Sequence, residues 1–564
     1  MSIQFVRVLR HIAVCSLCLL LNGLLLIAES SDQKLKTDSI FAGESLLEIS
    51  IQLPPQDWRI LRTQYSNLSV RPDENGFKPS SYTYFKGDIT IDGLKVQAVG
   101  IRKKGSMGSV ISTRPSLKIK FNKHAKGQRF AGLRHITLNN NNQDPSRIHQ
   151  YLVYKVFREA GVPAPRCNLA RVTVNGEYLG IYSHVESIKT EFLERHFDDA
   201  NGNLYEGQGV DFREGHARFE RKTNEAIPGR SELDAVVKIL ATEKSDLLEE
   251  LGEILELDAF MRFWSAEVLT GHWDRYALNM NNFFLYQSPV SGKLNLIPWG
   301  ADSAFGDRSP FISYEPPASV YAESLLCRRL YQNPEGRKRY RSVMREVLDS
   351  AWDQDELLRE VDRLEALIAE HIVLSPAASS AGREKVRNYI RAKGAAVRAD
   401  LAGDAPDYPV QKQVKPEASE KGTLVGTFKT KWSDSVTPNP LDGEATFRMV
   451  IGDEEIEFAK MGANAGISFD PVRSEYPSIR LYGFKAKGGG TILCMLAVDP
   501  YRWEKGVSLN VDKFQVFGVL METSEDAGPD DFHFKGMLQG TLKLDKSSRV
   551  SGEEVSGSVN LEWR

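Results

Sequence analysis

The stretch GHWDRYALNMNNFFLY, residues 271–286, together with PWGAD at 298–302, gives the strongest indication of the fold of this chain. It places Asp274, Asn279 and Asn282 in one short segment, and Asp302 ends the next strand-like run. Carboxylate and amide oxygens are ligands that Mg²⁺ takes in proteins. This region therefore predicts a site that works with a divalent cation.

The spacing His-x-Asp-x-x-x-x-Asn, from His272 to Asn279, is that of a protein-kinase catalytic loop. In such a loop the Asp orients or deprotonates the acceptor hydroxyl and the Asn holds a metal ion. Asp302 stands beyond the following hairpin, where a second metal ligand is needed. Taken singly, Asp274 and the asparagines are also explained as turn caps, and His272 is better explained as a packing residue than as a catalytic one. Their order in the chain favours phosphoryl transfer.

The elements on either side of this segment predict an α+β fold. Residues 45–121 show the alternation of β-strands, with a hairpin turn at Asp92-Gly93. A helix is expected from Ser146 to Gly161, and then a strand pair that turns at Asn175-Gly176. From Ser231 the pattern is helical, over about 231–241, 244–255, 258–270, 335–373 and 381–402. A sheet lobe, a hinge and a helical lobe in this order predict a protein kinase-like two-lobed domain over 45–402.

The C-terminal part has a different character. A polar linker with three prolines covers 403–420, and short strand-like runs separated by turn signals fill 421–564. This spacing predicts an all-β sandwich or barrel of about seven to nine strands, of unknown role.

The N-terminus has the order of an export signal over residues 1–30: basic residues, an apolar run, then small residues. The run is also just long enough for an uncleaved membrane anchor. A flexible lead-in is expected over 31–44. We therefore expect an exported protein, in the periplasm, in the cell envelope or secreted, that meets a membrane only if the signal is uncleaved.

Composition excludes some classes of partner. A formal net charge of −3 gives no long-range attraction to nucleic acid or anionic membranes. Beyond the signal, Cys167, Cys327 and Cys494 form no disulfide framework and no zinc motif, so each is expected to be a small buried hydrophobic residue.

Several motifs, in this order, resemble the spore-coat CotH kinase family of atypical, often secreted kinase-like proteins. The similarity covers about 45–400 and leaves the C-terminal β region outside it. The motifs are IRKKGSMGS (101–109), PSLKIKF (115–121), LNNNNQDPSRI (138–148), EAGVPAPR, VNGEYLGIYSHVE, GNLYEG, GHWDRYALNMNNFFLY and IPWGAD.

The resemblance implies a role for each site residue. Asp274 would be the catalytic or metal-organising acid, and Asp302, with Asn279 and Asn282, would hold Mg²⁺ or Mn²⁺. Lys118 would bind the phosphates of ATP, with Lys120 as the alternative; by default either lysine is a solvated strand residue. The loop from Gly105 to Gly108 would bring backbone N–H groups over the phosphates.

One residue departs from the family pattern, which commonly reads Pro-Trp-Asp-x-Asp. This chain has Gly300 at the first acid and keeps Asp302 at the second. If the first acid is essential, metal binding fails and the domain is a pseudokinase. If Asp302 is the ligand, the site is intact, and this is the expectation we favour.

Two functions remain open at this point. The first is an exported kinase that transfers the γ-phosphate of ATP to Ser or Thr hydroxyls of a protein substrate with a divalent metal; other nucleotide transfers are not excluded. The second is a degenerate kinase-like envelope or surface protein whose C-terminal β domain binds glycan or protein. The intact Asp274–Asn279–Asp302 set favours the enzyme, and Gly300 with the export signal favours the binding protein.

Overall fold

The computed structural model describes residues 37–65, 82–105, 107–213, 216–226, 229–242, 246–306, 316–373, 375–408, 421–435, 438–470, 473, 475–512, 515–523 and 532–563. The predicted signal at 1–30, the start of the lead-in and most of the linker lie outside these residues. By its contacts the chain forms two units. Unit 1 comprises 1–61, 67–104 and 116–408, and unit 2 comprises 62–66, 105–115 and 409–564. No helix in the described part of the chain is long and apolar enough to cross a membrane.

Unit 1 begins with a closed barrel rather than an open sheet. The barrel closes because β1 pairs antiparallel with β2 on one side and parallel with β6 on the other. The two predicted hairpin turns are confirmed: Asp92-Gly93 and Asn175-Gly176 all have positive φ, as a two-residue turn of this type requires. The strands, in barrel order, are β1 (Leu47–Gln52), β2 (Phe85–Ile91), β3 (Leu94–Lys103), β4 (Leu117–Lys120), β5 (His135–Asn139), β7 (Glu177–Val185) and β6 (Cys167–Val174).

The barrel region carries more helix than its sequence predicts. The expected helix is present as α3 (His149–Glu159), but α2 (Pro55–Thr63) lies in the stretch predicted to be β, and α4 (Thr190–Phe197) was not predicted. The signal for α2 is Pro55 at its first position with Asp57 in the first turn, both of which favour a helix start.

The rest of unit 1 is helical around a small sheet, as the pattern from Ser231 predicted. The sheet has the order β11-β10-β8-β9. Its strand β10 follows the loop that carries Asp274, and β11 leads to Asp302. Its strands are β8 (Asn203–Gly207), β9 (Glu220–Arg221), β10 (Phe283–Gln287) and β11 (Leu294–Pro298). The helices are α5 (Ser231–Leu240), α6 (Leu247–Ile254), α7 (Leu257–Thr270), α8 (Tyr276–Asn279), α9 (Leu325–Gln332), α10 (Pro334–Ala351), α11 (Gln354–Ile368) and α12 (Pro376–Ala402).

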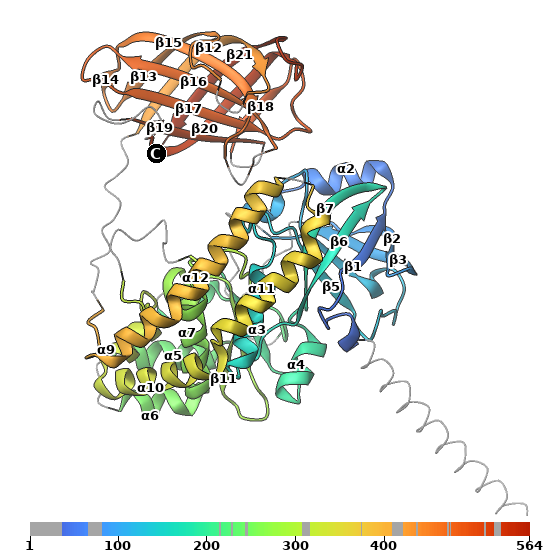
Figure 1. Cartoon of the computed structure of the whole chain (residues 1–564), viewed down its shortest axis with the longest axis vertical. Coiled ribbons are helices and arrows are strands. Elements are labelled where there is room, and N and C mark those ends of the chain that lie inside the picture. Colours follow the sequence, from blue (N-terminus) through green and yellow to red (C-terminus); the bar gives the residue numbers. More distant parts are fainter. Residues whose placement is uncertain are drawn as a thin grey trace, which may run out of the picture. The chain divides into compact units, whose positions relative to one another are not determined.

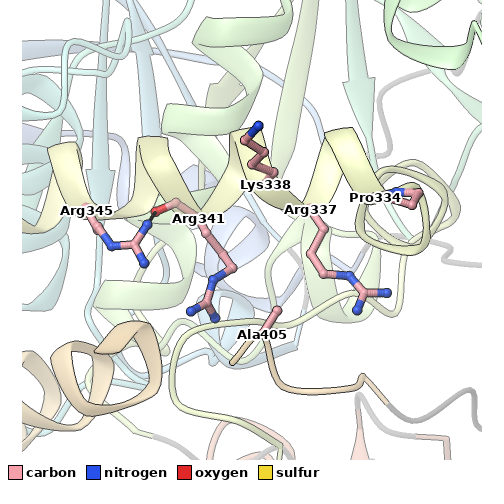
Figure 2. A pocket seen from close by; sticks show the side chains of 6 residues that line it. All are labelled: Pro334, Arg337, Lys338, Arg341, Arg345 and Ala405. Atoms are coloured by element: carbon pink, nitrogen blue, oxygen red, sulfur yellow. Dashed lines mark hydrogen bonds between the residues drawn. The ribbon is translucent and has the colours of Figure 1, made fainter. Parts of the chain in front are cut away.

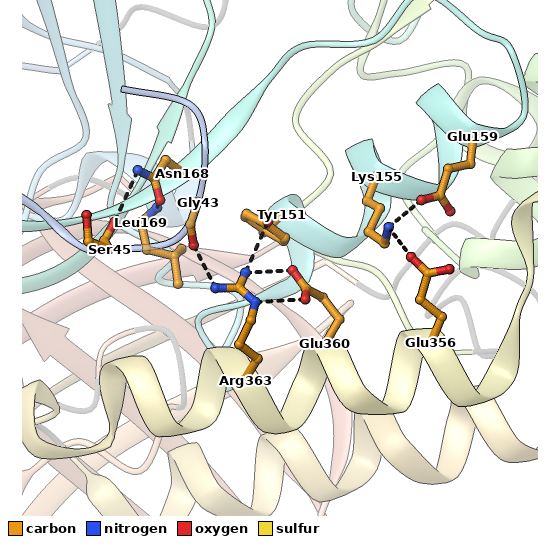
Figure 3. Close-up of polar contacts among 10 residues, drawn as sticks. All are labelled: Gly43, Ser45, Tyr151, Lys155, Glu159, Asn168, Leu169, Glu356, Glu360 and Arg363. Carbon is orange, nitrogen blue, oxygen red and sulfur yellow. Dashed lines mark hydrogen bonds and ion pairs between the residues drawn. The ribbon is translucent and has the colours of Figure 1, made fainter. Parts of the chain in front are cut away.

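The last two helices of unit 1 lie side by side (Figure 1). Arg383 and Arg387 of α12 form ion pairs with Glu365 of α11. The segment before β1 is tied to the same helices: Arg363 of α11 donates to the Gly43 carbonyl at 2.7 Å and to the Tyr151 hydroxyl at 3.1 Å (Figure 3). These contacts fix the start of the barrel to the helical part of unit 1.

A groove of about 460 Å³ beside α10 is lined by basic side chains, among them Arg341 and Arg345, which bind the end of another helix (Figure 2). Arg341 donates to the carbonyls of Leu401 and Gly403 at 3.1 and 2.6 Å, and Arg345 donates to Leu401 at 2.7 Å. The last carbonyls of a helix have no partner within the helix. These arginines therefore satisfy the C-terminal end of α12, and the groove is not the candidate site.

In unit 2 the described residues after the linker are all β. Pairings from β12 through β15, β16, β17, β19, β20 and β21 return to β12 and close a ring around an apolar core that includes Trp432, Trp503 and Trp563. The strands are β12 (Gly422–Ser433), β13 (Glu444–Ile451), β14 (Glu454–Glu455), β15 (Phe458–Ile467), β16 (Pro477–Lys485), β17 (Thr491–Val498), β18 (Ser508–Val511), β19 (Val516–Glu522), β20 (His533–Ser547) and β21 (Glu554–Trp563).

The three cysteines of the described residues, Cys167, Cys327 and Cys494, are free and buried, as expected.

Candidate functional site

The loop that carries Asp274 starts where α7 ends. Gly271 takes the left-handed conformation that commonly ends a helix, with φ of 59°. The short helix α8 then follows, and the buried Glu267 carboxylate accepts the backbone N–H groups of Tyr276 and Ala277 at 2.9 and 3.0 Å. Burial raises the pKa of Glu267 to about 7, against these hydrogen bonds and the charge of Arg275. The buried Glu267 therefore fixes the backbone of the loop at the start of α8.

Three amide groups converge on the Asp274 carboxylate. Asn281 and Asn282 donate to Oδ2 at 2.9 and 2.8 Å, and Asn279 donates to Oδ1. Burial raises the pKa of Asp274, although the three amides favour its charged form. Asn279 and Asn282 thus use their side-chain N–H groups on Asp274, and each keeps a side-chain oxygen of the type that can bind a metal ion. The structure thus brings Asp274, Asn279 and Asn282 together, and adds Asn281, which the sequence did not single out.

The PWGAD loop lies directly against this segment. Trp299 N donates to the Asn282 carbonyl at 3.1 Å, and Trp273 N donates to the Ser303 carbonyl at 3.2 Å. Gly300 has φ of +55°, and a Cβ added to it would lie 2.4 Å from Oδ1 of Asn282. The place of the family's first acid is therefore occupied by the amide of Asn282, on a backbone conformation that favours glycine.

An aspartate at position 300 is expected to lower the stability of the folded protein. A residue with a side chain in the left-handed region costs roughly 1–2 kcal/mol, and here the Cβ also displaces Asn282 from Asp274. We expect Gly300→Asp to lower the free energy of unfolding by more than about 1 kcal/mol in urea titrations and not to raise activity. Gly209→Ala is the matched control, since Gly209 has φ of +57° and open space around its Cβ position. A more active Gly300→Asp variant would instead identify Gly300 as a lost ligand.

Asp302 is held by residues that precede and begin α3. Its side chain is 7% exposed and its Oδ2 accepts Asn139 Nδ2 at 3.3 Å. His149 Nδ1 donates to the Asp302 carbonyl at 2.8 Å, and its other ring nitrogen lies 3.3 Å from Asp144. Burial raises the pKa of Asp302 to about 6, although Lys104 and Asn139 favour the charged form. Asn139 and Asp144 of the LNNNNQD segment thus position Asp302, the first directly and the second through His149.

Unit 1 also contains a group of half-buried lysines, one of which, Lys104, interacts with the charge of Asp302. Among the described residues, the amino groups of Lys104, Lys118 and Lys189 make no ion pair or hydrogen bond. Burial, with the charges of Lys189 and Arg102, holds the pKa of Lys118 well below its usual value. Burial also lowers the pKa of Lys104, against the attraction of Asp302 and Glu206. Burial and the repulsion between neighbouring cations both disfavour the charged forms of Lys104 and Lys118, and a bound anion would offset this cost.

One acid is embedded in this lysine group. Glu206 of β8 pairs with Lys222 at 2.5 Å, and Lys222 also reaches Glu220 at 2.5 Å. Although burial opposes it, the pKa of Glu206 falls to about 2, because Lys222 and Lys118 stabilise its charged form. Glu206 keeps Lys222 in place and leaves Lys104, Lys118 and Lys189 for a ligand.

The site residues predicted from sequence fall into two groups. Asp274, Asn279, Asn282, Asp302 and Lys118 all belong to unit 1. Gly105 and Gly108 belong to the segment 105–115 of unit 2.

The sequence did not single out Lys189, Lys222, Glu206 or Asn281, and it gave Asn139 no role at the site. Lys104 belongs to the basic triplet Arg102-Lys103-Lys104, for which a solvated strand end is favoured over a loop that faces phosphate, while the other two lysines stand alone in the sequence.

The donor set fits a magnesium ion that is shared with phosphates. Within the described ranges no cluster of three or more His, Cys, Asp and Glu would hold a metal alone. Mg²⁺, however, is often bound through one or two carboxylates and completed by phosphate oxygens and water. Asp302 and the amide oxygens of Asn279 and Asn282 are ligands of the right type, and Lys104, near Asp302, would take a phosphate.

The chain is similar to a known family and to several known proteins. The profile of the CotH kinase protein family matches residues 101–393, more than half of the chain. The chain is 25% identical over 263 residues to the inner spore coat protein H of Bacillus subtilis. This alignment covers 44% of this chain and 71% of that protein. It is 24% identical over 269 residues to invasin CotH2 of Rhizopus delemar. This alignment covers 43% of this chain and 44% of that protein. The match thus spans less than half of the fungal relative.

A solved structure is also similar, at a greater distance. The crystal structure of the Helicobacter pylori proinflammatory kinase CtkA aligns with a TM-score of 0.26 and 10% identity, over 51% of this chain and 90% of that chain. A likeness at this level carries no argument. The family profile, which includes every unit 1 residue of the candidate site, decides the assignment: the chain belongs to the CotH kinase protein family.

Proposed function

We propose that this protein is an exported kinase that transfers the γ-phosphate of ATP to a Ser or Thr hydroxyl of a protein, with Mg²⁺ or Mn²⁺. The observation that carries the proposal is the group of half-buried lysines, Lys104, Lys118 and Lys189, whose amino groups make no ion pair or hydrogen bond within the described residues, with Lys104 near the buried Asp302. A chain of phosphates supplies the negative charge that these lysines lack. Family membership supports the same conclusion.

Each residue has a distinct task in this proposal. Lys118, Lys104 and Lys189 would bind phosphate oxygens, and Asp302, Asn279 and Asn282 would hold the metal ion, which neutralises charge on the phosphates. Asp274 would accept or orient the hydroxyl of the acceptor, and Asn281 would keep its carboxylate in one orientation. Phosphoryl transfer depends mainly on such positioning and on electrostatic stabilisation.

A second function is favoured by one specific observation. The Asp274 carboxylate already accepts three amide groups, so its oxygens are engaged in holding its own loop together. A degenerate kinase-like domain, with unit 2 as a module that binds glycan or protein at the cell surface, would be compatible with this arrangement. Unit 2 lies almost wholly outside the family match, so this second function would come from a part of the chain that the family does not include.

The location of the protein is part of the proposal. Its relatives bear the names inner spore coat protein and invasin, which indicate outer or surface proteins. Together with the N-terminal pattern of an export signal, these names support a secreted or surface location for this chain.

The test is transfer of labelled γ-phosphate from ATP, with Mg²⁺ and separately Mn²⁺, by protein that starts at residue 31. The kinase proposal expects label on the protein or on an added acceptor protein. Labelled α-phosphate in the same assay would identify nucleotidyl transfer. No label from either nucleotide, and no rise in melting temperature with MgATP, would support the degenerate domain.

Lys118→Met is expected to weaken MgATP binding by about tenfold or more, since a hydrogen bond to a charged group contributes roughly 1.5–3 kcal/mol. Lys120→Met is the matched control, because Lys120 lies two residues further along the same strand. Isothermal titration of both variants with MgATP measures the difference. Equal losses, or a loss confined to Lys120→Met, would contradict the role of Lys118.

A further inference from the structure

The first backbone N–H groups of α8 are satisfied from outside the loop that carries Asp274. The first N–H groups of a helix have no acceptor within the helix itself. Here Tyr276 N donates to Oε1 of Glu267 at 2.9 Å, and Ala277 N donates to Oε2 at 3.0 Å. Glu267 lies on α7 and is 3% exposed. Each oxygen of this buried carboxylate thus takes one N–H group of α8.

The position of α8 determines the positions of two residues of the candidate site. Asp274 lies two residues before Tyr276, and Asn279 is the last residue of α8. Asn279 N donates to the Arg275 carbonyl at 2.8 Å, which closes the helical turn between them. The side-chain amide of Asn279 donates to Asp274, so a shift of this turn would move both residues. Glu267 therefore acts on the site through the backbone of α8.

A buried cation in the same loop depends on the charge of Glu267. Arg275 is 1% exposed, donates to the His272 carbonyl, and has its guanidinium 4.1 Å from the centre of the Tyr321 ring. Its Nε and Nη2 atoms have no hydrogen-bond partner within the described ranges. The charge of Arg275 favours the ionised form of Glu267, and the carboxylate in turn offsets the cost of burying the guanidinium.

The other titratable groups that face Glu267 come from the helices packed against α7, and they are neutral. Cys327 of α9 and Tyr340 of α10 both lie in the field of its charge, and burial raises the pKa of each well above its usual value. The hydroxyl of Tyr276 donates to the next acid, Asp211, and burial likewise raises the pKa of Tyr276. These groups give Glu267 no further cation to stabilise its charge.

We propose that Glu267 is a positioning residue for the loop that carries Asp274, and that it does this only as a charged carboxylate. A proton turns one of its two acceptor oxygens into a hydroxyl, and glutamine replaces that oxygen with an NH₂ donor. In both cases an N–H group at the start of α8 loses a charge-assisted hydrogen bond, and Arg275 loses its counter-charge. The loop is therefore ordered above about pH 7 and loosens below it. The consequence for phosphoryl transfer rests on the proposed function.

The same carboxylate should make the folded protein less stable. Burial outweighs Arg275 and the two hydrogen bonds and raises the pKa of Glu267 from 4.5 to about 7. The folded protein thus binds this proton more tightly than the unfolded chain, so the stabilisation is complete below about pH 4.5 and is lost as the pH rises through 7. Removing the charge is therefore expected to loosen the loop without destabilising unit 1, which a purely structural role would not do.

The experiment measures hydrogen exchange of the Tyr276 and Ala277 amides in the full chain without nucleotide, at pH 5.5 and pH 8. Mass spectrometry with fragmentation to single residues gives each rate, which is divided by the rate of the unfolded amide at the same pH. The amide of Trp264, in the middle of α7, is the internal reference for the stability of unit 1. Glu267→Gln is compared with Glu253→Gln, the matched control, since Glu253 is exposed on α6.

We expect the protection of the two amides, relative to Trp264, to fall about tenfold or more in the wild type between pH 8 and pH 5.5, because hydrogen bonds to a charged group are weakened. Glu267→Gln should show the low protection at both pH values, with a melting temperature at pH 8 equal to or above that of the wild type. Glu253→Gln should behave as the wild type.

Equal protection of the wild type at both pH values would overturn the proposal, and this comparison needs no variant. Full protection in Glu267→Gln at pH 8, or a lower melting temperature with equal loss at Trp264, would also overturn it. Transfer of labelled phosphate from ATP is then assayed separately. A protein that shows the change in exchange but transfers no phosphate would keep the role of Glu267 in the loop and reject the proposed function.

Discussion

Asp302→Asn is expected to lower the rate of phosphoryl transfer by about 10³-fold, since a metal ion contributes several kcal/mol to charge stabilisation and each 1.36 kcal/mol is a factor of ten. Asn keeps the size of the side chain and its contact with Asn139, but it loses the charge that would attract the metal. Steady-state assays at saturating Mg²⁺ measure the loss. Excess Mn²⁺, which binds nitrogen and oxygen ligands more tightly, is expected to recover part of it.

The expected loss of activity in Asp302→Asn does not come from unfolding. Burial already disfavours the charged form of Asp302 and raises its pKa to about 6, so a neutral side chain does not remove a stabilising charge. The melting temperature of Asp302→Asn without metal is therefore expected to equal or exceed that of the wild type at pH 7.5. Asp407→Asn is the matched control, because the Asp407 side chain is almost fully exposed. Full activity in Asp302→Asn would show that the ligand role assigned to Asp302 is wrong.

Local patterns predicted much of unit 1 correctly. Asp92-Gly93 and Asn175-Gly176 indicate their turns because few other pairs adopt positive φ at two successive positions. The long helices after Ser231 follow from their apolar spacing. By contrast, the parallel pairing of β1 with β6 closes the barrel between residues more than a hundred positions apart, and no local pattern encodes it.

The candidate site shows the same division. Asp274, Asn279 and Asn282 lie in one short loop, so their spacing already indicated that they act together. Lys189 and Lys222 come from other elements, and each alone has the pattern of a solvated surface residue. The placement of segment 105–115 in unit 2 depends on Tyr476 and Asp499, far along the chain, and could not be predicted from the sequence of the segment itself.

The folded protein is expected to lose stability steeply in mild acid, because it buries neutral histidines. Burial, and then nearby cationic groups, lowers the pKa values of His135, His184, His196 and His272 to about 3. His184 is 1% exposed, and neither of its ring nitrogens has a partner among the described residues. It stacks on Phe41 with ring centres 4.6 Å apart, and Arg166 lies over the same Phe41 ring. A proton on His184 would therefore be buried without a counter-charge.

The sign of the effect follows from proton linkage. The unfolded chain binds a proton on each histidine near pH 6.5, while the folded protein does so only near pH 3. The stabilisation is thus complete above pH 6.5 and is lost as the pH falls towards 3. For each of the fully buried His184 and His272 the loss at pH 5 is about 2 kcal/mol, and for the partly exposed His135 and His196 it is smaller.

His184→Phe isolates one of these contributions. Phenylalanine preserves an aromatic ring against Phe41 and takes up no proton, so the variant should lose about 2 kcal/mol less than the wild type between pH 7.5 and pH 5. Urea titrations at the two pH values measure this difference, and His124→Phe, at an exposed position, should behave as the wild type. Together the buried histidines amount to a large share of the 5–15 kcal/mol that stabilises a typical domain. Equal acid sensitivity of wild type and His184→Phe would mean that the folded state accepts a proton at His184, through an opening of the segment that carries Phe41.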